Sequence, residues 1–127
     1  MGINMRSEGL VNTLHEYTFH ILGCGAIGSS AATQLLRCGA KNFVLYDMDK
    51  VATENIGVSQ YMDEHIGMLK TEALEEHLMS INCRNVEIIQ SPEYFNMFRY
   101  QNNNDIVILG FDSMKSRKHA VQEICSN

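Results

Sequence analysis

The chain has 127 residues, of which 45% are hydrophobic, and this length and composition predict one domain with a single hydrophobic core over residues 1–127. The formal net charge of −5 and the lack of a long basic run argue against a nucleic-acid partner, because no basic stripe could neutralise a phosphate backbone. No apolar run approaches the length that spans a bilayer, so we expect no membrane association.

The first expected strand leads into a glycine-rich turn. Residues 1–16 are polar with scattered apolar positions and predict an arm or a short helix. Residues 17–22 predict a strand that ends abruptly at a glycine-rich turn, which contains Gly23, Gly25 and Gly28. The first glycine permits a tight turn, the second lets a phosphate approach the backbone, and the third lets a helix pack closely on the strand. We call residues 23–28 the glycine loop, and it predicts a nucleotide phosphate site.

A helix and a second strand follow the glycine loop. Residues 26–37 predict an amphipathic helix. Its expected apolar face includes Ile27, Ala31 and Leu35 together with their neighbours. Residues 43–46 predict the second strand, which ends at Asp47. An acid at this place in a dinucleotide-binding fold accepts hydrogen bonds from ribose hydroxyls, although a strand-end aspartate can also serve a turn.

The next segments continue the alternation of strands and helices. Residues 48–66 lack a clear period and predict a loop, and residues 67–81 predict an amphipathic helix. Residues 86–89 predict a third strand. Ser91, which a proline and an acid follow, predicts the start of a short helix that ends near Tyr100.

The last segments complete the expected fold. Residues 105–110 predict a fourth strand whose apolar run is typical of a parallel strand covered on both faces. Asp112 and Ser113 predict the start of a final helix that continues to Cys125. This order predicts an α/β fold with a Rossmann-like, mostly parallel sheet, strand order 3-2-1-4, flanked by helices. The first and fourth strands are then neighbours, so the glycine loop and Asp112 should face each other across a crevice.

The cysteines and histidines show no pattern typical of a metal site. The four cysteines include no C-x-x-C pair, so we expect no structural zinc, and we expect reduced thiols in a cytoplasmic protein. Cys24 lies within the glycine loop, where packing of a small side chain is the simpler interpretation. Cys125 has no base or oxyanion partner in the sequence and is not expected to be a nucleophile. His20 lies within a strand and is expected in the core or at an edge.

A longer succession of residues gives the glycine loop a specific context. The succession consists of Asp47, Asp49, Glu54, Asn55, Gly67, Lys70, Ile81, Asn82, Gly110, Asp112, Ser113 and Arg117. In order and spacing it resembles the ThiF/MoeB superfamily, the ATP-dependent adenylating domains that include ubiquitin-activating enzymes. The resemblance covers roughly residues 17 to 120 and implies the amino-terminal half of such a domain.

The resemblance implies a function and roles for single residues. Such domains adenylate the C-terminal carboxylate of a ubiquitin-like or sulfur-carrier protein, or of a peptide, and release pyrophosphate. The glycine loop would lie under ATP, Asp47 would hold the ribose, and Asn55 and Lys70 would hold phosphate oxygens. Asp112 would carry Mg²⁺. Considered alone, Lys70 is typical of a solvated helix start and Asp112 of a helix cap.

The sequence departs from the family pattern at one cationic residue. The family usually has an arginine and a glutamine shortly after the asparagine, and the arginine grips the phosphates. Residues 55–61 contain no arginine, and Gln60 and Tyr61 match the end of that motif only with a one-residue insertion. Losing such a contact slows catalysis unless another arginine replaces it. Arg6 is the candidate, because family dimers can lend an N-terminal arginine to the partner's site.

Length is a second departure. Family domains are typically much longer, and half a sheet leaves an open edge, which proteins usually cover. We therefore expect a fragment of a longer protein, a degenerate member of the family, or a unit that forms a homodimer or heterodimer.

Three functions fit these residues. The leading one is an ATP-binding adenylation domain that acts on a protein or peptide carboxylate. The missing arginine and the short length instead favour a catalytically inactive nucleotide-binding or scaffold subunit. An NAD-binding module requires only the glycine loop and Asp47, and it gives no role to Asn55, Lys70 or Asp112.

Overall fold

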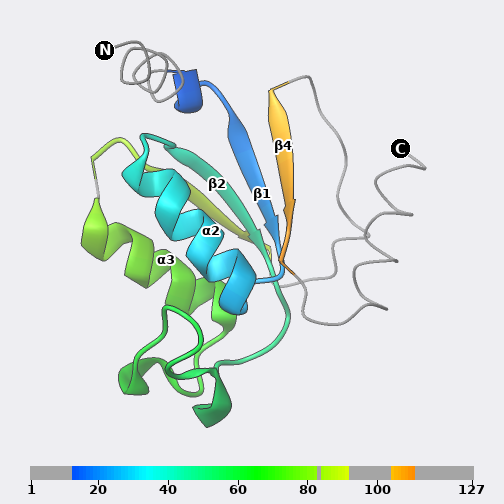
Figure 1. The fold of residues 1–127 in the computed structure, drawn as a ribbon, viewed down its shortest axis with the longest axis vertical. Coiled ribbons are helices and arrows are strands. Elements are labelled where there is room, and N and C mark those ends of the chain that lie inside the picture. The colour runs from blue at the N-terminus through cyan, green and yellow to red at the C-terminus, as the bar shows by residue number, and fades with distance from the viewer. Residues whose placement is uncertain (1–12, 83, 92–103, 111–127) are drawn as a thin grey trace, which may run out of the picture.

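The computed structural model describes residues 13–82, 84–91 and 104–110, which contain a four-stranded parallel sheet. Its strands are β1 (Thr18–Leu22), β2 (Asn42–Tyr46), β3 (Glu87–Ser91) and β4 (Asp105–Leu109). Their order is β3-β2-β1-β4, which confirms the predicted order (Figure 1). Because Leu22 pairs with both Tyr46 and Leu109, the carboxyl ends of β1, β2 and β4 lie at one edge of the sheet.

Two helices cover one face of this sheet. α2 (Ala26–Arg37) follows β1 and α3 (Lys70–Ile81) precedes β3, and both lie in front of the sheet in Figure 1. Alternate strand side chains form the core with these helices, namely Phe19, Ile21, Phe43 and Leu45 with Ala32, Leu36, Leu74 and Leu78. The crossover, residues 47–69, contains two 3-10 turns, η1 (Thr53–Asn55) and η2 (Asp63–His65), at the lower end of the figure.

The buried face of α2 differs from the predicted one. The bounds are confirmed, but Ile27 is 47% exposed, and Ala31 and Leu35 are only partly buried. The buried residues are instead Gly28, Ser29, Ala32, Thr33 and Leu36. The cause is a close approach at Gly28, where a Cβ would lie 1.8 Å from the Gly23 carbonyl oxygen. Small side chains therefore face the sheet in the first turns of α2, where Ile27 turns outward, while Leu36 fills the core farther along the helix.

The start of α3 also differs, since the helix begins at Lys70 and not at residue 67. Gly67 N–H donates to the Val51 carbonyl at 2.9 Å, and Val51 N–H donates to the Met68 carbonyl at 2.8 Å. This segment thus pairs with the start of the crossover before the helix forms. Gly67 has a φ of +91°, which is outside the helical region and suits glycine.

The outer strands show smaller differences. β3 ends at Ser91, so the residue predicted to cap a helix is the last residue of a strand. In β4 the residues after Asp105 are half-buried, so the expected cover on both faces is incomplete at this outer strand of the described sheet. The predicted helices before Tyr100 and after Asp112, and most of the predicted arm, lie outside the described residues.

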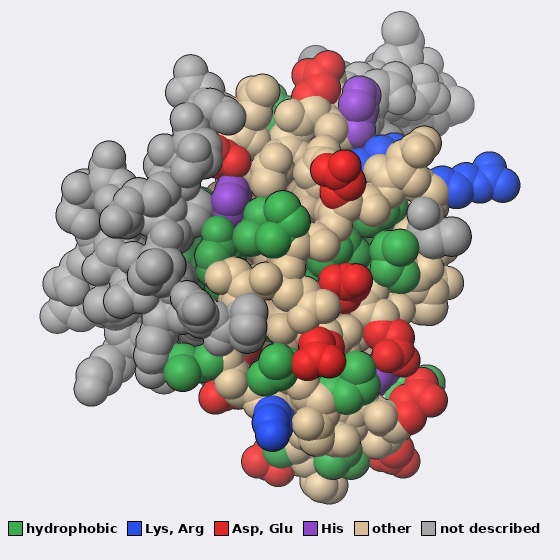
Figure 2. All heavy atoms as spheres, turned by 180° about the vertical axis from the view of Figure 1, so that it is seen from behind, with side chains coloured by type: hydrophobic (Ala, Val, Ile, Leu, Met, Phe, Trp, Pro, Cys, Tyr) green, Lys and Arg blue, Asp and Glu red, His purple; other side chains and the backbone are tan. Residues whose placement is uncertain are grey.

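The crossover forms an acidic end of the molecule. Its exposed charged residues are Asp49, Lys50, Glu54, Asp63 and Glu64. Figure 2, which shows the molecule from behind, has acidic side chains gathered at this lower end. Among the described residues, no helix is long and apolar enough to cross a membrane.

Candidate functional site

The glycine loop lies where β1 ends and α2 begins. Gly23 has a φ of +99°, which favours glycine, and its N–H donates to the Tyr46 carbonyl at 2.8 Å. α2 starts directly after Gly25, whose carbonyl accepts from the Ser29 N–H at 2.9 Å. No described residue accepts a hydrogen bond from the Gly25 N–H. The loop therefore offers a backbone donor and a helix N-terminus at the carboxyl edge of the sheet, which suits an anion.

Gly110 brings the end of β4 against the glycine loop. A Cβ at Gly110 would lie 2.5 Å from the Gly23 carbonyl oxygen and 2.7 Å from the Gly28 Cα. Its N–H donates to the Leu22 carbonyl at 2.7 Å, which continues the pairing of β4 with β1. The sequence did not identify this contact, because only the register of the strands reveals it. The available signal was a glycine directly after a parallel strand.

Asp47 bonds the glycine loop through its carboxylate. Its Oδ2 accepts from the Cys24 N–H and its Oδ1 from the Asp49 N–H, both at 2.8 Å. Burial raises the pKa of this carboxyl, while the two N–H donors and the charge of Lys70 act in the opposite direction. Each carboxylate oxygen retains a second lone pair. The geometry therefore permits the predicted ribose contact, which stays a prediction.

Lys70, the first residue of α3, is a buried cation beside the glycine loop. Only 8% of it is exposed, and its charge acts on the pKa values of Asp47 and Cys24. Within the part of the chain that the structure describes, its ammonium makes no hydrogen bond or ion pair. An anion bound between Lys70 and the glycine loop would pair with this charge.

A closed chain of hydrogen bonds joins these groups, and we call it the Lys70 circuit. Lys70 N–H donates to the Asp49 carbonyl at 2.9 Å, and Asp49 N–H donates in turn to the Asp47 carboxylate, which bonds Cys24. The Tyr61 hydroxyl donates to the Cys24 carbonyl and lies 3.3 Å from the Lys70 carbonyl, which closes the circuit. Tyr61 was not predicted as a site residue, because it lies in an aperiodic loop and bonds backbone carbonyls.

The other predicted ligands have no described contact with the glycine loop. Asn55 lies in η1, where its Oδ1 accepts from a backbone N–H at 2.7 Å. Within the described residues its amide nitrogen has no hydrogen bond, so it can serve as a donor. The crossover does return to α2, since Gln60 N–H donates to the Ser29 hydroxyl at 3.4 Å. Asp112, the predicted Mg²⁺ ligand, and Arg6 lie outside the described residues.

A second buried polar cluster, the His20 cluster, lies on the sheet face opposite the helices. His20 is 5% exposed, with Nδ1 3.1 Å from the Tyr46 hydroxyl and Nε2 2.9 Å from Asp105 Oδ1. A neutral imidazole satisfies both contacts when Nδ1 accepts from the hydroxyl and Nε2–H donates to the carboxylate. Burial and the charge of Asp105 raise the pKa of Tyr46 to about 12, so this hydroxyl stays protonated. The cluster pairs its polar groups with one another.

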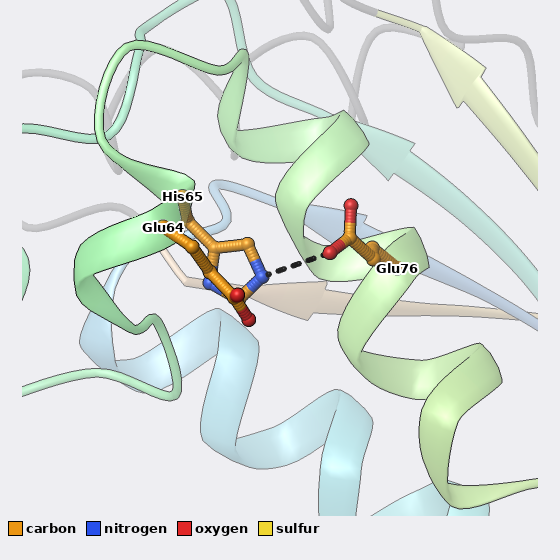
Figure 3. Close-up of side chains that lie close together, drawn as sticks. All are labelled: Glu64, His65 and Glu76. Carbon is orange, nitrogen blue, oxygen red and sulfur yellow. Dashed lines mark ion pairs between the residues drawn. The ribbon is translucent and has the colours of Figure 1, made fainter.

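A cluster of three possible metal ligands, which the sequence did not predict, consists of Glu64, His65 and Glu76 (Figure 3). His65 Nε2 lies 3.6 Å from Glu76 Oε1, and Nδ1 accepts from the Met62 N–H at 2.9 Å. A neutral imidazole has one nitrogen with a free lone pair, and because Nδ1 accepts from Met62, Nε2 carries the proton. A metal at Nε2 would move that proton to Nδ1 and so break the hydrogen bond from Met62. We therefore interpret the group as a link between η2 and α3.

Comparison with known protein families gives one match over most of the chain. The family model described as the ThiF family matches residues 3–127. A curated relative, ubiquitin-like modifier-activating enzyme 5 from Dictyostelium discoideum, is 33% identical over 116 residues, which cover 89% of this chain and 28% of the relative. The protein of the same name from Oryza sativa subsp. japonica is 38% identical over 69 residues, which cover 54% of this chain and 16% of the relative. The chain thus spans less than a third of the length of these relatives.

Solved structures share the fold. TcdA (CsdL) superimposes with a TM-score of 0.81 at 22% identity, over 94% of this chain and 49% of that one. Escherichia coli MccB, solved with ATP, superimposes with a TM-score of 0.78 at 21% identity, over 91% of this chain and 36% of that one.

Proposed function

The chain belongs to the ThiF family, and from this premise we propose that it is an adenylation domain that binds ATP and uses Mg²⁺. Its substrate would be the C-terminal carboxylate of a ubiquitin-like protein, a sulfur-carrier protein or a peptide, which it would convert to an acyl-adenylate. The names of its relatives support this type of chemistry. They include ubiquitin-like modifier-activating enzymes, MccB solved with ATP, and TcdA solved with AMP.

One observation carries the proposal. Lys70 is buried beside the glycine loop, and no described residue pairs with its ammonium. The Gly25 N–H and the start of α2 offer further positive groups to the same region. Together these groups suit a polyphosphate, and the lone pairs of Asp47 suit a ribose hydroxyl. The residues that the structure describes therefore fit a nucleotide.

The chemistry requires orientation and charge stabilisation. The carboxylate of the substrate would attack the α-phosphate in line, and pyrophosphate would leave. The glycine loop would orient the phosphates, while Lys70 and Asn55 would stabilise the charge that develops on the departing pyrophosphate. None of these residues needs to form a covalent bond with the substrate.

Asp112 is the residue that we propose as the ligand of Mg²⁺. A carboxylate is a ligand type that Mg²⁺ takes, and the ion would supply further neutralisation of phosphate charge. The chain reaches the glycine loop two positions earlier, at Gly110, which packs on Gly23 and Gly28.

A catalytically inactive nucleotide-binding or scaffold subunit is the second candidate, and one observation favours it. The crossover has Lys50 as its only Lys or Arg, and that side chain is exposed at the acidic end of the molecule. The cation that the family uses after the asparagine is therefore not replaced within the described crossover. An NAD-binding module would use the glycine loop and Asp47 but would not require Asn55, Lys70 or Asp112.

The biological setting is part of the proposal. We place the chain in the cytoplasm, in a homodimer or heterodimer, with a ubiquitin-like or sulfur-carrier protein or a peptide as its partner. A dimer would cover the outer strands of the described sheet and could supply the missing arginine.

Thermal unfolding with added nucleotides tests the proposed function. A ligand that binds only the folded protein stabilises it by about 2.7 kcal/mol at a hundredfold excess over its dissociation constant. We expect stabilisation by ATP with Mg²⁺, less by AMP, and none by NAD. Stabilisation by NAD alone, or by no nucleotide, would contradict the proposal. Pyrophosphate release in the presence of a carrier would then separate an active domain from the scaffold subunit.

A further inference from the structure

Tyr61 connects the two halves of the proposed phosphate site. Its side chain is 3% exposed, and its ring packs edge-on against His65 with centroids 6.0 Å apart. The hydroxyl donates to the Cys24 carbonyl in the glycine loop and lies 3.3 Å from the Lys70 carbonyl at the start of α3. Burial, with the neighbouring Cys24 and Asp47, raises the pKa of this hydroxyl, so it remains a donor.

Cys24 is held on both sides of its backbone. Its N–H donates to Asp47 Oδ2 at 2.8 Å, and its carbonyl accepts from the Tyr61 hydroxyl. In a trans peptide the carbonyl of one residue and the N–H of the next point in opposite directions. Because the Cys24 carbonyl turns inward to the buried Tyr61 hydroxyl, the Gly25 N–H must turn the other way. That N–H is one of the loop donors that no described residue uses, together with the first N–H groups of α2.

We propose that the Tyr61 hydroxyl is a positioning group that aims the Gly25 N–H at bound phosphate and fixes it relative to Lys70. This inference rests on the proposed function, since it assumes that a nucleotide phosphate occupies the region between them. Without the hydroxyl, the Cys24–Gly25 peptide can rotate. The Gly25 N–H and the Lys70 ammonium then no longer bind the same phosphate. The ribose contact of Asp47 does not depend on this peptide.

Tyr61→Phe tests the inference, because it retains the packed ring and removes only the hydroxyl. Isothermal titration should show about a tenfold rise in the dissociation constant for ATP with Mg²⁺, and less than about a twofold change for adenosine. Tyr17→Phe is the matched control, since that ring packs near Phe19 at 6.4 Å just before β1, away from the glycine loop. It should change neither constant.

A double variant separates positioning from general destabilisation. If Tyr61 acts by aligning the loop donor with Lys70, Tyr61→Phe should weaken ATP binding much less in a Lys70→Ala background than in the wild type. Equal losses for ATP and adenosine, or the same tenfold loss in both backgrounds, would overturn the positioning role.

Hydrogen exchange tests the contact without any nucleotide. In Tyr61→Phe, amides of residues 22–28 should exchange about tenfold faster than in the wild type, while the second half of α3 stays unchanged. Absence of nucleotide binding by the wild type would overturn the proposed function and this inference with it. Nucleotide binding by the wild type, with unchanged exchange and unchanged ATP affinity in Tyr61→Phe, would overturn the inference alone.

Discussion

The His20 cluster and the Lys70 circuit meet at the end of β2, and they differ in whether their charged groups have partners. Tyr46 belongs to the His20 cluster, where the imidazole pairs with a hydroxyl on one side and a carboxylate on the other. Asp47, the next residue, belongs to the Lys70 circuit. The circuit pairs its backbone groups, but the Lys70 ammonium has no partner among the described residues.

We interpret this difference as one between a structural role for the His20 cluster and the proposed binding role of the Lys70 circuit. A polar cluster that pairs its own groups offsets the cost of their burial and stabilises the fold. The Lys70 side chain is largely buried, and its charge has no counter-ion among the described residues, so it remains available to an anion. An unpaired charge of this kind is therefore better evidence for a candidate site than burial of polar groups alone.

The largest effect is expected from filling the close contact behind the glycine loop. Gly28→Ala would place a methyl group 1.8 Å from the Gly23 carbonyl oxygen. α2 would have to move off the loop, and we expect a loss of at least about 3 kcal/mol in the free energy of unfolding. Gly57→Ala is the control, because no atom lies within 4 Å of its Cβ and only its φ of +90° is unfavourable. It should cost about 1–2 kcal/mol in urea denaturation. Equal losses in both variants would show that the loop is not closely packed.

The next largest effect is expected from removing the carboxylate of the His20 cluster. Asp105→Ala leaves His20 Nε2–H without its carboxylate in a buried environment, and we expect a loss of about 3 kcal/mol. Asp105→Asn retains an oxygen acceptor and should lose only about 1 kcal/mol. The folded fraction of both variants should bind nucleotide as the wild type does. A weakened ATP affinity in Asp105→Asn would mean that the two clusters are coupled and that the comparison fails.

The smallest effect is a pH dependence in the circuit. Burial raises the pKa of Asp47 above its ordinary value of 3.8, so the folded protein takes up this proton more readily than the unfolded chain. The resulting stability is fully present below pH 3.8 and is lost as the pH rises through the folded-state pKa. Asparagine cannot titrate in this interval. The free energy of unfolding of the wild type, minus that of Asp47→Asn, should therefore fall as the pH rises through it. A difference that grows with pH in urea denaturation would contradict the assigned direction.

The sequence was sufficient for the parts of the fold that depend on order and period. The glycine loop, the bounds of α2 and the strand order follow from a strand–turn–helix pattern and from the right-handed connection of parallel strands. Asp47 was predicted from its place at the end of a strand and Lys70 from the resemblance to the family, and their roles as ligands stay predictions. The placement of Ile27 on the buried face of α2 was wrong, because its apolar character favoured burial while the contact at Gly28 decides which side turns inward.

The remaining features depend on contacts that leave no pattern in the sequence. Tyr61 contacts backbone carbonyls, which every residue possesses, so no residue type at a fixed distance along the sequence reveals its partners. The pairing of His20 with Asp105 requires the register of β1 against β4, which only the folded sheet provides. Asp112 stays a prediction, since it lies outside the described residues.

Urea unfolding of Lys70→Met, with and without ATP and Mg²⁺, tests the central claim most directly. Methionine retains an unbranched apolar side chain and removes the charge, so the free protein should keep its stability or gain up to about 1 kcal/mol. Stabilisation by ATP should disappear. Lys41→Met is the control, because Lys41 Nζ is exposed and donates to the Arg84 carbonyl at 3.5 Å, and it should change neither quantity. A Lys70→Met protein that loses about 2 kcal/mol on its own and is still stabilised by ATP would contradict the account.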